Sequence, residues 1–150
     1  MAYLAIALSY YAVDDNANAL KHVDKAIVAD DKVDYQDVPA FELKMRICIE
    51  DANRTAFGSL AAQVKANIND SQLRNHVVVR LYKVCEPYYV HFFNDEDGGL
   101  GIKHEYIRFM RDAMQFFCEI GSGEIWLISN DIRRRLDIAL EKHRLVENLI

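Results

Sequence analysis

The residues with the most obvious chemistry lie at 94–105, where the sequence reads NDEDGGLGIKHE. Carboxylates before a glycine, with Glu105 near the end, are the ligand types of a calcium-binding loop. The spacing fits poorly, because neither Gly98 nor Gly99 as the turn glycine places suitable residues at every ligand position. These glycines are also followed by no Lys-Ser/Thr pair that would hold a phosphate. We therefore interpret the acidic Gly-rich loop at 94–101 as a solvated segment.

Two histidines flank this loop. His91 and His104 would lie near its carboxylates if the chain folds back there, and Glu105 follows directly. No two of the five histidines have the four-residue helical spacing of a metal pair, and His143 stands on an apolar stripe that favours a packing role. We assign no cofactor and no metal ligand. The hypothesis kept as the alternative is a small helical metal-binding protein or enzyme centred on the loop with His91 and His104.

The three cysteines indicate reduced thiols. Cys48, Cys85 and Cys118 are widely spaced, odd in number and surrounded by apolar residues. This usage favours a cytoplasmic protein with buried thiols over a disulfide framework or a zinc site. No electropositive surrounding is visible that would activate a cysteine nucleophile. With no Ser/His/Asp signature either, the sequence predicts a protein that is not an enzyme.

The charge balance narrows the partners. A formal charge of −5 and a pI near 5.5 argue against a dedicated nucleic-acid binder. Arg133, Arg134 and Arg135 make one helix locally basic, which we interpret as a solvated face, with docking of an acidic partner or nucleic acid as the alternative. The apolar N-terminal stretch is broken by Asp14 and Asp15 before it reaches the roughly 20 residues that a membrane span requires. We expect no membrane insertion.

Helices must position all of these side chains. Two prolines and six glycines in 150 residues leave most of the chain free to be helical, so we predict one all-α domain of about seven helices, with hairpins at 1–69 and further helices at 70–150. Aromatic and β-branched runs allow a small β-hairpin near 88–107 or 117–129 instead. The predicted helices are 2–13, 16–29, 38–52, 54–68, 71–93, 103–120 and 123–148.

Capping residues, prolines and a glycine support these helix boundaries. The run Asp14-Asp15-Asn16 can cap the second helix, Asn53 the fourth, and Asp70 or Ser71 the fifth. Pro39 fits the first turn of the third helix, and Gly121 is a natural end for the sixth. Pro87 predicts that the fifth helix kinks or stops near Glu86. In the last helix Ile132, Leu136, Ala139, His143, Val146 and Ile150 form one face expected to pack on a core.

The first two helices carry a recurring order of residue sizes. Aromatic, aliphatic, small and aromatic residues are followed by small, large and small ones, at Tyr3, Ile6, Ala7, Tyr10, Ala19, Val23 and Ala26. This order resembles one tetratricopeptide repeat at 3–31. Small side chains at Ala7 and Ala19 would let the helices cross closely. The sequence departs from the family at Asp31, where proline is usual, and at Asp14, where glycine is frequent.

A weaker copy follows at 40–66. Matching Asn53 to Asn16 pairs Leu43 with Ile6 and Ala56 with Ala19, but Lys44 replaces the small Ala7. Gln63 likewise replaces Ala26, so we treat this stretch as a degenerate hairpin of the same kind. No third copy is convincing, since 106–140 is interpreted as lacking small residues at its crossing point.

The resemblance implies where a partner would bind. In tetratricopeptide repeats the first helix of each pair lines a groove, which here implicates Leu4, Leu8 and Tyr11 and, in the second hairpin, Phe41 and Met45. The cationic clamp of many family members is missing. An apolar groove must be covered by the chain's own later helices, by an amphipathic helix of a partner or by a second copy. The sequence thus predicts a protein-interaction module or regulator that binds a partner protein or self-associates.

Overall fold

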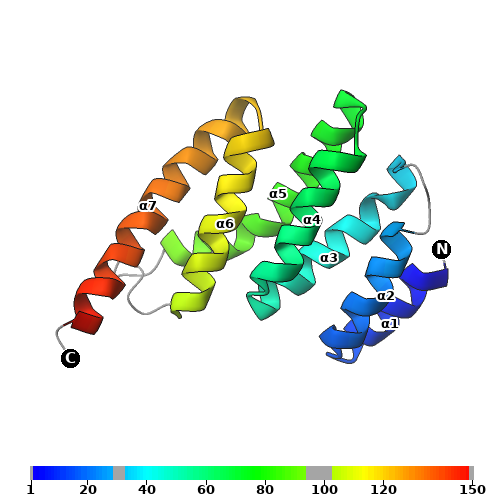
Figure 1. Ribbon diagram of the computed structural model, residues 1–150, viewed down its shortest axis with the longest axis horizontal. Helices are drawn as coiled ribbons and strands as arrows, with labels where there is room; N and C mark the ends of the chain where they lie inside the picture. Colours follow the sequence, from blue (N-terminus) through cyan, green and yellow to red (C-terminus); the bar gives the residue numbers. More distant parts are fainter. Residues whose placement is uncertain (1, 29–32, 94–102, 149–150) are drawn as a thin grey trace. The chain divides into compact units, whose positions relative to one another are not determined.

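The computed structural model describes residues 2–28, 33–93 and 103–148, which form seven α-helices and a short 3-10 turn (Figure 1). They contain no strand, so the all-α prediction is confirmed and the described parts of 88–107 and 117–129 form no β-hairpin. The elements are α1 (Ala2–Ala12), α2 (Asn16–Val28), η1 (Tyr35–Asp37), α3 (Val38–Asp51), α4 (Arg54–Asn67), α5 (Ser71–Phe93), α6 (His104–Ile120) and α7 (Gly123–Asn148).

The helices group into two compact units, Met1–Val84 and Cys85–Ile150. The first holds α1 to α4 with most of α5, and the second holds the end of α5 with α6 and α7. The boundary lies inside α5, whereas the sequence divides the hairpins from the later helices between residues 69 and 70. The single-domain organisation stays a prediction.

Pro87 does not end its helix. The sequence predicts a kink or a stop near Glu86, but α5 continues through Pro87 to Phe93. Because proline has no N–H, the carbonyl of Lys83 loses its partner four residues later in this turn. This missing hydrogen bond lies at the boundary between the two units.

Side-chain caps begin the helices where the sequence predicts them. Asp15 Oδ1 accepts the backbone N–H of Asn18 at 3.2 Å, and the Asn18 amide also donates to Oδ2 at 2.8 Å. These hydrogen bonds from Asn18 lower the pKa of Asp15. Asn53 Oδ1 accepts the Ala56 N–H at 3.0 Å. Asp70, rather than Ser71, caps α5 by accepting the N–H groups of residues 72 and 73.

The hairpin of α1 and α2 is closely packed. Ala7 and Ala19 are completely buried, and the two backbones run close together along their length (Figure 1). Small side chains permit this approach because interaxial distance depends on the residues at the contact. The turn places Asp14 in the left-handed region (φ 61°), so an aspartate adopts the conformation for which glycine is usual. The close crossing predicted from the two alanines agrees with the structure.

The hairpin of α3 and α4 has the same turn in a different register. Ala52 is left-handed (φ 49°) and the Asn53 N–H donates to the Cys48 carbonyl at 2.9 Å, as Asp15 N–H donates to the Tyr10 carbonyl at 2.9 Å. Asn53 therefore corresponds to Asp15. The sequence match, which paired Asn53 with Asn16, is wrong by one residue.

The corrected register explains a difference in packing. Ala7 and Ala19 correspond to Met45 and Phe57, two large side chains that are both buried. The α3 and α4 backbones accordingly approach each other much less than α1 and α2 do. The structure is compatible with a helical-repeat fold, but the second hairpin does not repeat the small-residue crossing of the first.

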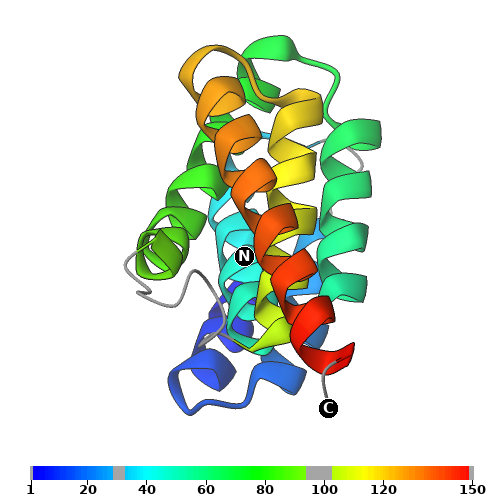
Figure 2. The same cartoon turned by 90° about the vertical axis from the view of Figure 1, so that its left-hand side faces the viewer.

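The helices α6 and α7 form another close pair (Figure 2). The small residues Ala113, Ser129 and Ala139 of this pair are all buried, and the absence of small residues at its crossing point stays a prediction. Ile132 and Leu136 are buried as the apolar stripe predicts, whereas Val146 is exposed and Ile150 lies outside the described residues. Gly121 ends α6 as predicted, and a side chain there would clash with the Phe117 carbonyl.

Candidate functional site

The helix α1 has a composition unlike that of the other described helices. Its eleven residues, AYLAIALSYYA, include no charged side chain. It is too short to span a bilayer, and no other helix in the described ranges is long and apolar enough to do so. A helix without charged residues is normally covered by apolar groups on more than one side.

Only one side of α1 is covered. Ala7 is buried, and Leu4, Tyr10 and Tyr11 on the same side are half-buried. At about 100° per residue, the opposite side presents a row of small residues with large apolar residues on both edges. We call this surface the outer face of α1; it consists of Ala2, Ala5, Ser9 and Ala12, with Leu8 on one edge and Ile6 on the other, all exposed, while the exposed Tyr3 lies beyond Ile6 toward the covered side.

The polar groups of this face are already satisfied within the helix. The Ser9 hydroxyl donates to the Ala5 carbonyl at 3.0 Å. Lys25 of α2 lies beyond the Ile6 edge, where its Nζ is 5.9 Å from the centre of the Tyr3 ring. The outer face therefore offers apolar contacts bordered on one edge by a positive charge.

The predicted partner-binding residues do not share one environment. Leu8 is 48% exposed and Leu4 half-buried on the same edge of α1. Tyr11 is also half-buried, and its hydroxyl donates to Glu50 of α3. Phe41 and Met45 are completely buried and so contribute to the core of α3. Their binding of a partner stays a prediction, and Leu8 alone of the five presents much of its side chain to solvent.

Polar contacts attach the first hairpin to α3. Beside the Tyr11 hydroxyl, the Asn16 side-chain amide donates to Glu50 Oε2 and to Asp51 Oδ1, each at 3.2 Å. All of these partners lie at the carboxyl end of α3. They fix the turn of the first hairpin against the last turn of α3.

A buried lysine makes the second attachment. Lys44 is 1% exposed, and its Nζ lies 2.6 Å from Asp24 Oδ1 of α2. The same ammonium donates to Ser59 Oγ at 3.3 Å and to Gln63 Oε1 at 3.4 Å, both on α4. One charged group thus joins three helices, with a partner for each of its protons. Lys44 and Gln63, the two mismatches of the degenerate repeat, are hydrogen-bonded to each other.

The cysteines have environments that suppress reactivity. Cys48 is completely buried, and desolvation raises the pKa of its thiol to about 12. Cys118 is half-buried, and desolvation again raises its pKa. A nucleophilic thiol needs the opposite shift, because the thiolate is the reactive form. These two thiols agree with the packing role that the sequence predicts for them.

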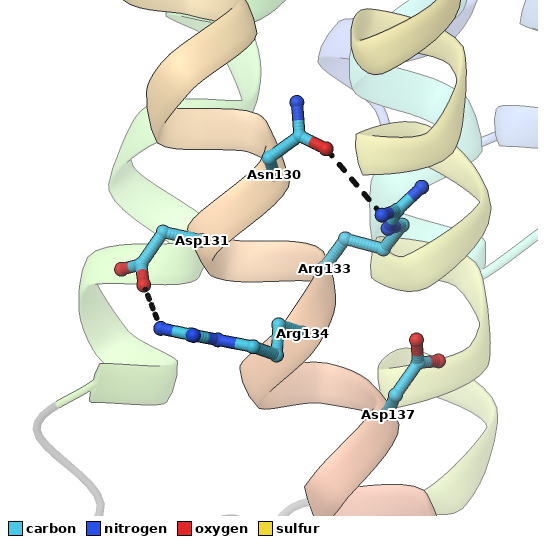
Figure 3. Close-up of a pocket in the computed structure, with 5 residues that line it drawn as sticks. All are labelled: Asn130, Asp131, Arg133, Arg134 and Asp137. Carbon is cyan, nitrogen blue, oxygen red and sulfur yellow. Dashed lines mark hydrogen bonds and ion pairs between the residues drawn. The ribbon is translucent and has the colours of Figure 1, made fainter.

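A shallow hollow on α7 collects charged residues without converging on a ligand. Figure 3 shows Arg133 and Asp137 pointing toward α6, while Asp131 and Arg134 lie on the other side of α7. Arg134 pairs with Asp131 at 2.9 Å. Arg133 donates to Gln115 Oε1 at 2.9 Å. Asp131 also pairs with Arg135 at 3.2 Å. Acidic or amide groups thus already pair with the three arginines of the basic run.

The structure describes only some of the residues of the metal-binding alternative centred on the acidic loop. The loop at 94–101 and the side chain of His91 lie outside the described residues, and Glu105 is exposed in the first turn of α6. In the ranges that the structure describes, no group of three or more His, Cys, Asp or Glu side chains could hold a metal ion. His104 instead contacts His143, whose ring centre is 5.6 Å away.

Comparison with known proteins adds no relative. No family model, curated protein or solved structure matches this chain. The tetratricopeptide resemblance therefore depends on the residues of the first hairpin. Two features were not predicted but had a signal in the sequence: the absence of charge in residues 2–12, and the hydrogen bond between the polar residues Lys44 and Gln63.

Proposed function

We propose that this protein is a non-enzymatic interaction module that binds an amphipathic helix of a partner protein against the outer face of α1. The observation that supports this most is the combination of exposed Tyr3, Ile6 and Leu8 on a helix with no charged residue. An apolar outer side is the kind of surface that a partner covers.

The shape of the face favours a helix as the occupant. The small residues Ala5, Ser9 and Ala12 form a floor between larger side chains, so another helix can approach closely along it. Helix-in-groove recognition uses apolar anchors spaced one turn apart on the incoming helix. The tetratricopeptide resemblance supports the same helix, since the first helix of each repeat lines the binding surface in that family.

Charge defines the partner further. A charged residue placed over the floor would lose its hydration without gaining a counter-charge. Lys25 stands beyond the Ile6 edge, beside Tyr3, so an acidic residue beside the apolar stripe of the partner would be favoured there. We therefore expect a partner helix with an uncharged stripe and acidic residues along one margin. A second copy of this chain would bring its own lysine to that edge, which favours a different protein as the partner.

The test uses a photo-crosslinking amino acid at position 8 and, as the control, at position 138. Ile138 is also an exposed aliphatic residue on a helix, on α7. The expected result is a crosslinked partner from position 8 and none from position 138, with the crosslinked peptide forming an amphipathic helix with an acidic margin. Equal crosslinking from both positions, or a product that contains only this chain, would contradict the proposal.

A charge substitution then measures the contribution of the face. Leu8→Asp should lower the affinity for the purified partner at least about tenfold, because burying an unpaired carboxylate costs more than 1.4 kcal/mol. It should leave the fold intact, since Leu8 is exposed. Tyr11→Asp is the poorer probe, because a new carboxylate would lie beside Glu50. Unchanged affinity of Leu8→Asp would show that the partner binds elsewhere.

A further inference from the structure

Two histidines distant in the sequence meet between α6 and α7. His104 opens α6 and His143 lies near the end of α7, yet their ring centres are 5.6 Å apart with the planes inclined at 62°. Both residues belong to the same compact unit, Cys85–Ile150. The sequence predicts a packing role for His143 and places His104 beside the acidic loop. It does not predict the contact between the two histidines.

The separation suits a shared metal ion. Zinc–imidazole bonds are about 2.0–2.1 Å long, so each ring centre lies about 3.2 Å from the ion and two tetrahedral ligands have centres about 5–6 Å apart. The observed spacing falls in this interval. A direct edge-to-face contact of two rings has a similar spacing, so a second observation has to separate the two explanations.

The second observation is a buried nitrogen. Nδ1 of His104 is shielded from solvent and has no hydrogen-bond partner among the described residues. A buried ring nitrogen without a partner loses its hydration with no compensation. In metal sites, one ring nitrogen of a histidine binds the ion and the other donates its N–H to a nearby acceptor. Either role would satisfy Nδ1 of His104.

We propose that His104 and His143 bind one divalent transition-metal ion. Imidazole nitrogens suit zinc, nickel and copper, and they are poor ligands for calcium or magnesium, which prefer oxygen. The ranges described hold no third His, Cys, Asp or Glu in ligating position, so water completes the coordination. This site is independent of the outer face of α1 and does not involve the acidic loop.

The experiment titrates the full chain with zinc chloride and with nickel chloride by calorimetry and by thermal melting. Wild type should bind about one ion and melt at a higher temperature, because a ligand of the folded state stabilises it. His104→Ala and His143→Ala should each weaken binding at least about tenfold. The double variant should lose less than the sum of the two, because both residues serve one ion.

Three matched variants distinguish ligation from packing. His143→Phe keeps a ring in contact with His104 but removes the ligand, so it should fold and fail to bind. His76→Ala removes a histidine that contacts Tyr35 with ring centres 5.3 Å apart, and it should bind normally. Cys118→Ser removes a thiol that is not fully buried and should also bind normally.

Side-chain NMR provides a test that needs no variant. Zinc should shift the imidazole signals of His104 and His143 and leave those of His22 and His76 in place. Absence of binding by wild type, retention of binding in His143→Phe, or loss of binding in Cys118→Ser would each overturn the proposal. The His104–His143 contact would then be an edge-to-face packing contact.

Discussion

The two hairpins of the first unit share a turn and differ in their interiors. Each ends its first helix with a left-handed residue, Asp14 or Ala52, and caps the next with a side chain. Between the helices the first hairpin has alanines, whereas the second has Met45 and Phe57 in the corresponding places. The first pair is consequently close and the second pair more open. Turn chemistry thus sets the reversal of the chain, and side-chain size sets the spacing.

The first helices of the two hairpins, α1 and α3, differ in how many of their residues are buried. The first helix of the second hairpin is nearly enclosed, with nine of its residues buried, whereas α1 buries only Ala7. Both helices contain many apolar residues, but only α3, which also carries charged residues, has most of its apolar residues covered. The outer face of α1 therefore resembles a packing surface without its neighbour, which is the physical basis of the proposed function.

The largest expected effect comes from emptying the open hairpin. Phe57→Ala should destabilise the fold by about 3–5 kcal/mol, because a buried aromatic leaves a cavity that the surrounding helices fill only in part. Urea unfolding followed by circular dichroism measures this loss. A loss below about 1 kcal/mol would mean that Phe57 does not separate α3 from α4.

Filling the close hairpin tests the other half of the comparison. Ala7→Leu should cost about 2–3 kcal/mol, because there is no room for three more carbon atoms at the α1–α2 crossing. Ala5→Leu is the control, since Ala5 lies on the exposed side of the same helix and should change stability by less than about 0.5 kcal/mol. Equal effects of both substitutions would contradict the close crossing.

The buried lysine allows a charge test of the joint between the hairpins. Asp24→Ala removes the counter-ion of Lys44 and should cost about 2 kcal/mol, less than the 3–5 typical of a fully enclosed pair because Asp24 stays 46% exposed. Lys44→Met, which removes the charge and keeps the length, should stay within about 1 kcal/mol of wild type. If Lys44→Met is the worse variant, the ion pair itself stabilises the stacking.

Alkaline pH should lower the stability of the fold through the Cys48 thiol. The unfolded thiol of Cys48 ionises near pH 9.0, whereas burial raises its folded pKa to about 12. Its stabilising contribution is therefore complete below pH 9 and is lost as pH rises toward 12, by about 1.4 kcal/mol per unit at most. Comparing the pH dependence of wild-type stability with that of Cys48→Ala isolates this group. Parallel curves would mean that Cys48 is hydrated in the folded state.

Local physics explains what the sequence predicted well. Side chains such as Asp15 and Asn53 accept the free N–H groups of the helix that follows them, so they mark helix starts without knowledge of the fold. Ala7 and Ala19 predict a close crossing because small side chains let two helix backbones approach each other. At Pro87 one missing hydrogen bond did not end the helix, so the predicted stop is wrong, while the alternative of a kink stays a prediction.

What escaped prediction depends on residues far apart in the chain. The register of the second hairpin was wrong by one because Asn16 and Asn53 look equivalent, while the turn hydrogen bonds pair Asn53 with Asp15. The contact of His104 with His143, and the burial of Phe41 and Met45, are set by which helices become neighbours. Of the predicted binding residues, only Leu8 kept an open position that the sequence pattern suggested.

The most direct test of the central claim is the affinity of the crosslinked partner for Leu8→Asp relative to wild type, with Ile138→Asp as the matched control. We predict at least a tenfold loss for Leu8→Asp, which corresponds to about 1.4 kcal/mol, and an unchanged affinity for Ile138→Asp, with native circular dichroism for both. Equal affinities of wild type and a folded Leu8→Asp would contradict the assignment of the outer face of α1 as the binding surface.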